Sequence, residues 1–305
     1  MLAGMSPLME IARGWCDYRL IDSGDGRKLE EVGGLRFIRP EATALWSPHL
    51  ADSAWQNPSG IFVPAASSEE TSGKWQLTPQ VPARWEMAYD GMRFWAAPTP
   101  FRHFGFFPEQ ASHWQWCDAL LAKRHQPRLL NLFAYSGLAS LYAARKGAQV
   151  THIDSSKKAI DAAFANRSKA EMDHAPIRFI IEDASKFVDR ELRRGNRYDC
   201  ILLDPPKYGR GNHGEIWRLE SDLPPLMKKL AQLLSDTPVF IVVTAYAIRA
   251  SCLSLHHLLA ETVTGFGGKV TSGELCLRED REGGRIIPQA IFARWQAHDG
   301  SADTA

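Results

Sequence analysis

Three aspartates each follow a run of apolar residues, and their placement could gather acids for chemistry. Asp154 ends QVTHID, Asp183 follows IRFIIE, and Asp204 follows CILL. In an open sheet of parallel strands, ligands bind outside the carboxyl ends of the strands. We therefore expect the three carboxylates at one edge of a sheet, where they could accept hydrogen bonds from a ligand. The alternative is that each aspartate only forms a turn or caps the following helix.

The stretch ILLDPPKYGRG (201–211) makes the third of these acids distinctive. Pro205 and Pro206 each fix φ and remove a backbone donor, so we expect a rigid loop whose carbonyl oxygens face outward. Such a corner could hold a nucleobase or an amine. Tyr208 could offer a ring face to it, and Lys207 or Arg210 could contact a phosphate. The alternative is a stiff exit from a strand with no role in binding.

From residue 110 onward, predicted strands and helices alternate, and these elements position the three acids. The apolar runs and helical patterns predict an α/β fold, a doubly wound, mostly parallel sheet of the Rossmann-like kind. After the fifth strand, residues 269–295 read as two strands joined by REGGR with no helix between them, which predicts a terminal antiparallel hairpin and seven strands in all. The predicted parallel strands are 128–133, 149–153, 177–181, 199–203 and 238–244, and the predicted helices are 109–125, 138–147, 155–172, 185–195 and 219–234.

The first part of the chain has a different texture. Short apolar runs such as GLRFIRP and MRFWAAP are separated by Gly, Pro, Ser and Asp, which predicts a small β-rich domain with many tryptophans. Its aromatic rings could stack on bases or fill a small core. Residues 1–110 hold 10 Lys and Arg against 13 Asp and Glu, which is a poor surface for a phosphate backbone. We predict an N-terminal domain over 1–108, a second domain over 109–297, and a disordered tail over 298–305.

Composition excludes several classes of protein. The formal net charge is +1, so no strong global field attracts a polyanion. The five cysteines are scattered without a CxxC pair, which argues against a disulfide framework and against a zinc site, and favours a reduced compartment. No secretory signal or membrane-spanning run is visible, so we expect a cytoplasmic protein without a resident metal or membrane contact. The first predicted strand is followed by FAYSG, which lacks the G-x-G-x-x-G of a dinucleotide site.

Four motifs in this order carry a resemblance to a known family. NLFAYSG, HIDSS, EDAS and DPPK, closed by an antiparallel hairpin, resemble a class I S-adenosylmethionine-dependent methyltransferase. With HFGFFPEQASHW (103–114) ahead of the first strand, the chain more narrowly resembles the methyltransferases that modify cytosine C5 or guanine N7 in large-subunit ribosomal RNA. The resemblance covers roughly residues 100–295.

The resemblance assigns roles to individual residues. It implies that Asp154 binds the ribose hydroxyls of the cofactor, that Asp183 frames the adenine, and that Asp204 lines the methyl-transfer site. The implied cofactor is S-adenosyl-L-methionine, and its implied binding residues are Phe107, Glu109, Gln110, Asn131, Phe133, Ala134, Tyr135, Ser136, Gly137, Asp154, Ser155, Asn166, Asp183, Ala184 and Asp204. The implied methyl-transfer residues are Asp204, Pro205, Pro206, Lys207 and Tyr208.

One departure from that family bears on mechanism. Cytosine C5 methylation needs a cysteine thiolate that adds to the base. The family carries this cysteine after DPP or after the fifth strand, where this chain has Lys207 and Thr244-Ala245-Tyr246. We expect Cys200 and Cys252 to be packed thiols, as buried cysteines commonly are. The sequence therefore favours direct in-line methyl transfer without a cysteine nucleophile.

The leading hypothesis is a methyltransferase that acts on RNA, specifically ribosomal RNA. Two alternatives stay open: a methyltransferase for a small molecule or a protein, which the near-neutral charge and the acidic N-terminal region favour, and a non-catalytic module that binds cofactor or RNA. Clustering of basic side chains around the pocket would favour RNA, and the candidates are Arg124, Arg128, Lys207, Arg210 and Arg218.

Overall fold

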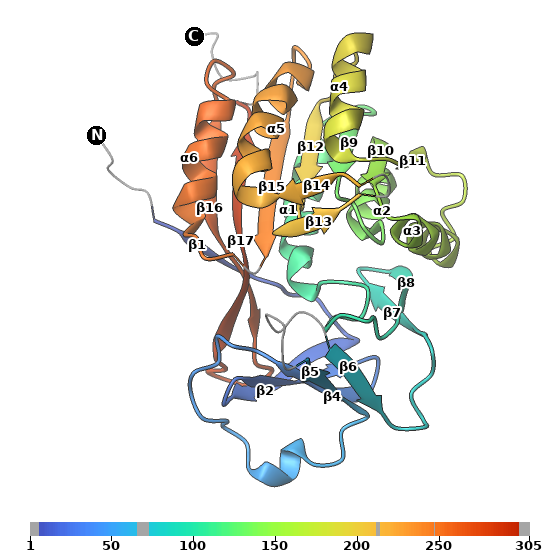
Figure 1. Cartoon of the computed structure of the whole chain (residues 1–305), viewed down its shortest axis with the longest axis vertical. Helices are drawn as coiled ribbons and strands as arrows, with labels where there is room; N and C mark the ends of the chain where they lie inside the picture. Colours follow the sequence, from blue (N-terminus) through green and yellow to red (C-terminus); the bar gives the residue numbers. More distant parts are fainter. Residues whose placement is uncertain (1–5, 66–72, 212–213, 247, 299–305) are drawn as a thin grey trace.

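The computed structural model describes residues 6–65, 73–211, 214–246 and 248–298 and is built around one large sheet with a smaller sheet beside it (Figure 1). The large sheet has eight strands in the order β1-β16-β17-β15-β12-β9-β10-β11. Its strands are β1 (Leu8–Ile11), β9 (Arg128–Leu132), β10 (Gln149–Asp154), β11 (Ile177–Ile181), β12 (Cys200–Leu203), β15 (Phe240–Tyr246), β16 (Lys269–Arg278) and β17 (Ile286–Gln296).

The central strands of this sheet are parallel, as the sequence predicts. β9 pairs in parallel with β10 and β12, and β12 pairs in parallel with β15. β17 runs antiparallel to both β15 and β16, which confirms the predicted terminal hairpin. An α/β fold with a mostly parallel Rossmann-like sheet is therefore confirmed, and β1 adds an eighth strand to the predicted seven.

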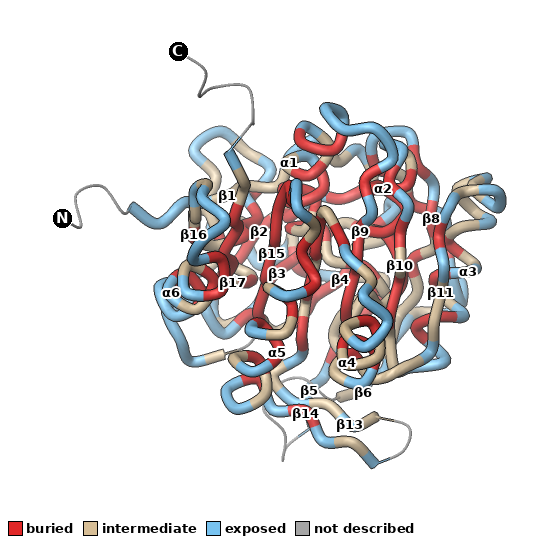
Figure 2. The backbone as a smooth tube through the Cα atoms, turned by 90° about the horizontal axis from the view of Figure 1, so that it is seen from above, coloured by how far each residue is buried: buried red, intermediate tan, exposed pale blue. Residues whose placement is uncertain are grey.

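Helices cover both faces of the large sheet (Figure 2). Because neighbouring residues of a strand face opposite sides, Leu129 packs into the core on one face and Leu130 into the core on the other. α1 and α2 contribute to the first core, and α4, α5 and α6 contribute to the second. The helices are α1 (Ala111–Leu121), α2 (Leu138–Arg145), α3 (Lys157–Lys169), α4 (Ala184–Arg194), α5 (Leu219–Leu233) and α6 (Cys252–Thr262).

The N-terminal region is β-rich, as expected. Its sheet has five strands in the order β2-β3-β4-β5-β6, and a separate hairpin is formed by β7 and β8. The strands are β2 (Tyr18–Gly24), β3 (Arg27–Val32), β4 (Leu35–Pro40), β5 (Gly60–Pro64), β6 (Gly73–Leu77), β7 (Trp85–Tyr89) and β8 (Met92–Ala96). The tryptophans of this region pack among its buried aromatic rings: Trp85 stacks on Phe37 and Trp75 lies against Phe104.

The two regions are joined by more than the chain between them. β1 precedes the small sheet in sequence but pairs with β16 of the large sheet. The β16–β17 hairpin in turn extends to the small sheet, where the Asp280 N–H donates to the Leu20 carbonyl (2.7 Å; Figure 1). The proposed division at residue 108 therefore stays a prediction in its exact position.

A disordered tail is predicted over 298–305; residue 298 is described, outside any helix or strand, and residues 299–305 lie outside the described residues. Among the helices of the described residues, none has the length and apolar character required to cross a membrane.

Candidate active site

The carboxyl ends of the parallel strands meet along one edge of the large sheet, as their pairing requires. β10 ends at Asp154, and Asp204 directly follows β12. The β9 strand runs into the turn 133–137, and β15 ends at Tyr246. The structure thus brings the turn FAYSG together with two of the three predicted carboxylates.

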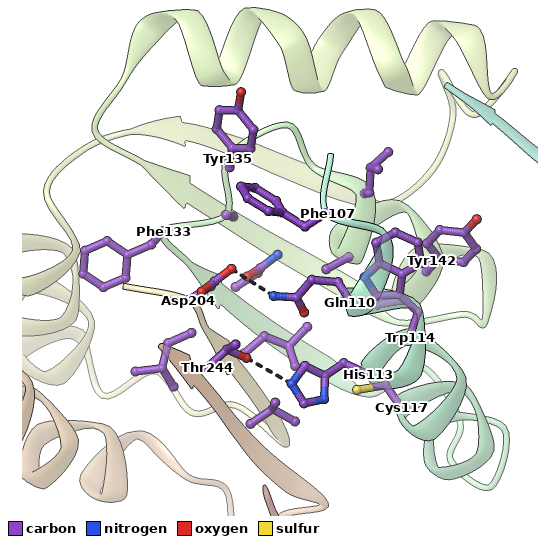
Figure 3. A pocket seen from close by; sticks show the side chains of 18 of the residues that line it. Phe107, Gln110, His113, Trp114, Cys117, Phe133, Tyr135, Tyr142, Asp204 and Thr244 are labelled. Carbon is purple, nitrogen blue, oxygen red and sulfur yellow. Dashed lines mark hydrogen bonds between the residues drawn. The ribbon is translucent and has the colours of Figure 1, made fainter. Parts of the chain in front are cut away.

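A pocket of about 760 Å³, including its open part, lies against this edge and extends inward between the sheet and helices α1 and α2 (Figure 3). Figure 3 shows Phe107 and Tyr135 close together at one side of the pocket, near the hydrogen-bonded pair Asp204 and Gln110. The pocket is lined by Phe106, Phe107, Gln110, His113, Trp114, Cys117, Asp118, Asn131, Phe133, Ala134, Tyr135, Ser136, Leu138, Ala139, Tyr142, Ala143, Leu202, Leu203, Asp204, Val242 and Thr244.

The turn after β9 has an unusual backbone. Phe133, Tyr135 and Gly137 all have positive φ, at +55°, +47° and +84°. For a residue with a side chain this conformation costs about 1–2 kcal/mol, so the surroundings must hold it. The Ala134 N–H donates to the Ile153 carbonyl (3.0 Å), and this bond ties the turn to β10. The strained turn places four side chains, those of Phe133, Ala134, Tyr135 and Ser136, on the wall of the pocket.

Asp154 holds the same turn through its carboxylate. Its Oδ2 accepts from the Tyr135 N–H (2.9 Å), and its Oδ1 accepts from the Ser156 N–H (2.8 Å). Burial raises the pKa of this carboxyl, and the two backbone hydrogen bonds oppose that rise. Each carboxylate oxygen has a further lone pair, so Asp154 can fix the turn and still accept hydrogen bonds from a ligand.

Asn166 and Gly137 hold the turn from the side of α3. The buried Asn166 donates from Nδ2 to the Ser136 carbonyl (2.9 Å) and accepts from the Trp95 N–H (2.9 Å). A Cβ on Gly137 would lie 2.8 Å from the Cβ of Ala163, which is too close for a side chain. The predicted role of Asn166 in cofactor binding stays a prediction, because the residue does not line the pocket and its amide is bonded to backbone.

Asp204 forms a polar corner with Gln110 and Tyr246. Gln110 donates from Nε2 to Oδ2 of Asp204 (3.0 Å) and to the Tyr246 hydroxyl oxygen (3.0 Å). Within the described part of the chain, the buried Oδ1 of Asp204 has no hydrogen-bond partner. Burial raises the pKa of Asp204 well above its usual range, and the nearby Glu109 raises it further. Buried polar atoms are normally hydrogen-bonded, so Oδ1 of Asp204 is available to a donor group of a ligand.

Glu109 lies beneath this corner. The residue is 3% exposed, and burial raises the pKa of its carboxyl, while a hydrogen bond from Tyr246 opposes the rise. The charge of Glu109 disfavours ionisation of Asp204 and so adds to the rise in the pKa of Asp204. Glu109 does not line the pocket, so it acts on the site through Tyr246 and through its charge.

Comparisons with known proteins identify the family of the chain. A solved structure described as a SAM-dependent methyltransferase from Agrobacterium tumefaciens is 45% identical to the chain and covers 95% of it, and the chain covers 93% of that structure, with a TM-score of 0.90. The chain belongs to the S-adenosylmethionine-dependent methyltransferases.

A family model and several curated proteins match parts of the chain. A family model described as Conserved hypothetical protein 95 matches residues 112–234. The ribosomal RNA large subunit methyltransferase K/L of Methylococcus capsulatus is 31% identical over 50% of this chain and 21% of its own length. The ribosomal RNA large subunit methyltransferase I of Aeromonas salmonicida is 33% identical over 34% of this chain and 26% of its own length. The chain thus spans about a quarter or less of these curated relatives.

In this methyltransferase Asp183, the remaining predicted acid, has another local role. Asp183 is the N-cap of α4, and its Oδ1 accepts from the Lys186 N–H (3.0 Å). Asp183 does not line the pocket, so the open alternative of a helix cap describes its contacts in the structure. Its contact with adenine stays a prediction, as does that of Ala184.

The loop after Asp204 differs from the expectation. The Pro206 carbonyl accepts from the Trp217 indole N–H (2.8 Å), and the Lys207 carbonyl accepts from the Leu219 N–H (3.0 Å). The expectation that these carbonyls face outward is therefore wrong, because a short hairpin folds back over them. The hairpin consists of β13 (Tyr208–Arg210) and β14 (Ile216–Arg218).

The pocket of this methyltransferase also has a buried histidine that the sequence did not single out as a site residue. Arg294 donates from Nε to Nδ1 of His113 (2.8 Å), and Nε2 of His113 lies 3.0 Å from the Thr244 hydroxyl. Since arginine is only a donor, Nδ1 must be the acceptor and the neutral ring carries its proton on Nε2. Burial lowers the pKa of His113, which agrees with a neutral ring. The Thr244 hydroxyl hydrogen is thereby left for another acceptor.

Eight of the predicted site residues line the pocket of this methyltransferase: Phe107, Gln110, Asn131, Phe133, Ala134, Tyr135, Ser136 and Asp204. The others lie around it or on the hairpin: Glu109, Gly137, Asp154, Ser155, Asn166, Asp183, Ala184, Pro205, Pro206, Lys207 and Tyr208. The assignments themselves stay predictions. The sequence reasoning missed the lining residues His113, Trp114, Tyr142 and Thr244. The sequence ASHWQWC (111–117) could have indicated some of them, because it places aromatic residues on a helix directly after HFGFFPEQ.

The cysteines do not supply a nucleophile in the geometry described. Cys200 and Cys252 are buried, as expected of packed thiols. Cys117 lines the pocket, but burial raises the pKa of its thiol to about 12, so the reactive thiolate is scarce at neutral pH. Among the described residues, no cluster of three or more His, Cys, Asp or Glu could hold a metal ion.

Proposed function

We propose that the chain transfers a methyl group from S-adenosyl-L-methionine to a base of RNA, and of ribosomal RNA in particular, by direct in-line transfer. The observation that carries the proposal is the Asp204 corner, where an acid with an unpaired buried oxygen opens onto the pocket behind the turn 133–137. The names of the curated relatives support ribosomal RNA as the substrate.

The residues present fit such a cofactor. Asp154, at the rim beside the turn, would accept hydrogen bonds from the ribose hydroxyls. Phe107 and the turn 133–137, with the buried Asn131 below, would enclose the rest of the molecule. When bound, S-adenosylmethionine supplies an electrophilic methyl group on a positively charged sulfur.

The protein's own contribution is alignment and exclusion of water. Holding two reactants in line contributes roughly 7–11 kcal/mol to lowering a barrier. Asp204 would accept a hydrogen bond or a proton from the base at Oδ1, while Gln110 fixes Oδ2. The raised pKa of Asp204 makes it a better proton acceptor near neutral pH than an ordinary aspartate. An exocyclic amine needs such an acceptor, whereas guanine N7 needs only orientation.

A small molecule or a protein is the second candidate substrate. The formal net charge of +1 and the excess of acids in residues 1–110 favour it. A non-catalytic module is a weaker candidate, because Asp204, Pro205 and Pro206 are all present in the corner. We also propose a cytoplasmic location, on the ground that all five cysteines, each within the described residues, are unpaired.

Binding of the cofactor is tested first. We expect S-adenosylmethionine to bind the wild-type protein in isothermal titration calorimetry, and we expect Asp154→Ala to abolish the heat of binding. Asp161→Ala on the exposed face of α3 is the control, because it removes an equally negative side chain whose ion-pair partner, as far as the described residues show, is Lys157. Unchanged affinity of Asp154→Ala would remove the cofactor assignment at this site.

The substrate is tested separately, by nucleoside mass spectrometry of RNA from cells with and without the gene. Loss of one methylated nucleoside from large-subunit ribosomal RNA supports the proposal, and its identity separates exocyclic-amine, N7 and C5 chemistry. Identical nucleoside profiles, together with intact cofactor binding, would reject RNA and favour a small molecule or a protein.

A further inference from the structure

The hairpin β13–β14 follows the Asp204 corner directly and has two different faces. Tyr208 pairs with Arg218, Gly209 with Trp217, and Arg210 with Ile216. Because side chains alternate along a strand, Trp217 points inward while the other side chains of the two strands point outward. The outward set, which we call the hairpin face, is Tyr208, Arg210, Ile216 and Arg218.

The inner side of the hairpin is firmly anchored. Trp217 is buried, its ring lies against Phe133 with centroids 4.8 Å apart, and its indole N–H donates to the Pro206 carbonyl. The Leu219 N–H donates to the Lys207 carbonyl at the base of the hairpin. Phe133 lines the pocket, so the hairpin is packed directly on the wall of the proposed cofactor site.

The outer side exposes an aromatic, an apolar and two basic side chains. Tyr208 is 49% exposed and Ile216 is 50% exposed, which is high for large apolar or aromatic side chains. Arg210 donates from Nε to the Tyr208 hydroxyl (3.0 Å), which orients both side chains. Considering only the described residues, neither Arg210 nor Arg218 has a carboxylate within ion-pair distance. The hairpin face therefore combines two available positive charges with an exposed ring.

This combination suits one kind of partner. Single-stranded nucleic acid is held by cationic side chains on its phosphates and by aromatic rings on its bases. A duplex would hide the base faces that Tyr208 could contact, and an acidic peptide would leave the ring without a stacking partner. The hairpin projects from the carboxyl edge of the large sheet, on the side of the small sheet (Figure 1).

We propose that the hairpin face binds the single-stranded RNA next to the nucleotide that is methylated. Tyr208 stacks on a neighbouring base, and Arg210 and Arg218 contact phosphates on either side of it. This proposal rests on the proposed RNA substrate, and it assigns the segment of the chain that grips that RNA. It moves Tyr208 from the methyl-transfer site to the surface that holds the flanking nucleotides.

The charge part is tested with the double variant Arg210→Gln/Arg218→Gln. Binding of a fluorescently labelled, mixed-sequence 12-nucleotide RNA is followed by anisotropy between 50 and 200 mM salt. Loss of two phosphate contacts lowers the slope of log affinity against log salt by about 1.4 and weakens binding about tenfold or more at low salt. The matched control, Arg124→Gln/Arg193→Gln, removes the same charge from positions before β9 and β12, at the opposite edge of the sheet, and is expected to bind RNA as the wild type does.

The stacking part is tested with Tyr208→Ala against Tyr208→Phe. The alanine variant is expected to lose about fivefold or more in RNA affinity, and the phenylalanine variant to keep it, because stacking requires the ring and not the hydroxyl. With RNA as the varied substrate, KM should rise while kcat at saturating RNA changes little. Cofactor affinity by calorimetry should stay at the wild-type value for both variants, which shows that the site itself is intact.

Three outcomes overturn the proposal. Hairpin variants that bind RNA as the wild type does, while the wild type methylates RNA, reject the hairpin face and leave the proposed function standing. Wild-type protein that binds S-adenosylmethionine but no RNA rejects both. Equal displacement of the labelled RNA by polyglutamate and by unlabelled RNA, with no effect of Tyr208→Ala, identifies a general anion surface and rejects stacking.

Discussion

Burial of Asp204 lowers the stability of the fold, and the same side chain is the proposed hydrogen-bond or proton acceptor. Its Oδ1 is buried and, within the described residues, has no partner, and burying an unsatisfied polar group costs about 1–3 kcal/mol. We expect Asp204→Asn to lower kcat by about a hundredfold or more and to raise the melting temperature at pH 7 by about 2 °C or more, since the neutral amide avoids the stability that burial of an acid with a raised pKa costs at this pH. Scanning calorimetry and a methylation assay on the same preparation check both.

The sign of the pH dependence follows from the raised pKa. Folded Asp204 binds its proton more tightly than the unfolded chain does, so its contribution to stability is greatest below the unfolded pKa of about 3.9 and falls as the pH rises toward the folded pKa. The advantage of Asp204→Asn should therefore vanish near pH 3 and grow toward neutrality. Asp161→Asn, an exposed acid, is the control with little change. A melting-temperature difference that shrinks with rising pH would contradict the assignment.

Cys252 tests whether the reaction needs a thiolate. It is buried at the start of α6 and does not line the pocket that Asp204 borders, so we expect Cys252→Ser to keep at least about half of the wild-type kcat. The measurement is turnover on RNA together with a search for a covalent RNA–protein adduct by denaturing electrophoresis. An adduct in the wild type that disappears with turnover in the variant would restore the cytosine C5 mechanism.

At the scale of elements, the turn 133–137 depends on its close contact with α3. We expect Gly137→Ala to destabilise the protein by about 1–3 kcal/mol in denaturant unfolding and to weaken cofactor binding, because the new methyl group would meet Ala163 at 2.8 Å. Gly147→Ala is the matched control: Gly147 also has positive φ, at +88°, but a Cβ there has nothing within 4 Å. Equal effects of the two variants would show that backbone strain, and not the contact with α3, sets the cost.

Prediction from sequence succeeded for the elements whose signal is local. The runs of Leu, Ile and Val mark β9, β12 and β15, and the acids that follow two of the parallel strands could be placed at the sheet edge from strand direction alone. The positive φ of Phe133 and Tyr135 could not be predicted, because packing and not residue type imposes it. The hairpin β13–β14 could not be predicted either, because strands of three residues are too short to show an alternating pattern.

Contacts between residues far apart in sequence could not be predicted from the sequence either. Arg294 and His113 are 181 residues apart in sequence, and nothing near either residue indicates that they meet. β1 is likewise a four-residue strand that belongs to the large sheet only because β16 offers it an edge. Of the five basic residues considered as an RNA-binding cluster, Lys207, Arg210 and Arg218 lie at the hairpin, whereas Arg124 and Arg128 precede or begin β9 at the other edge.

For the whole molecule, the two regions share a core. One buried cluster runs from Phe37 and Trp85 of the N-terminal region to Leu129 and Phe240 of the large sheet. We therefore expect thermal unfolding in a single transition. Tryptophan fluorescence, which reports mainly on residues 1–116, and far-ultraviolet circular dichroism should give midpoints that agree within about 2 °C. Two separated transitions would show that the regions unfold independently.

The pairing of β1 with β16 also has a consequence for synthesis on the ribosome. Leu8 lies opposite Gly273, and Glu10 forms an ion pair with Arg294, 284 residues later. During synthesis β1 therefore stays unpaired until almost all of the chain up to residue 294 has left the exit tunnel. At about 5–20 residues per second this delay is roughly 15–60 s. During that time the edge strand and its partner surface are available to chaperones, and to other nascent chains.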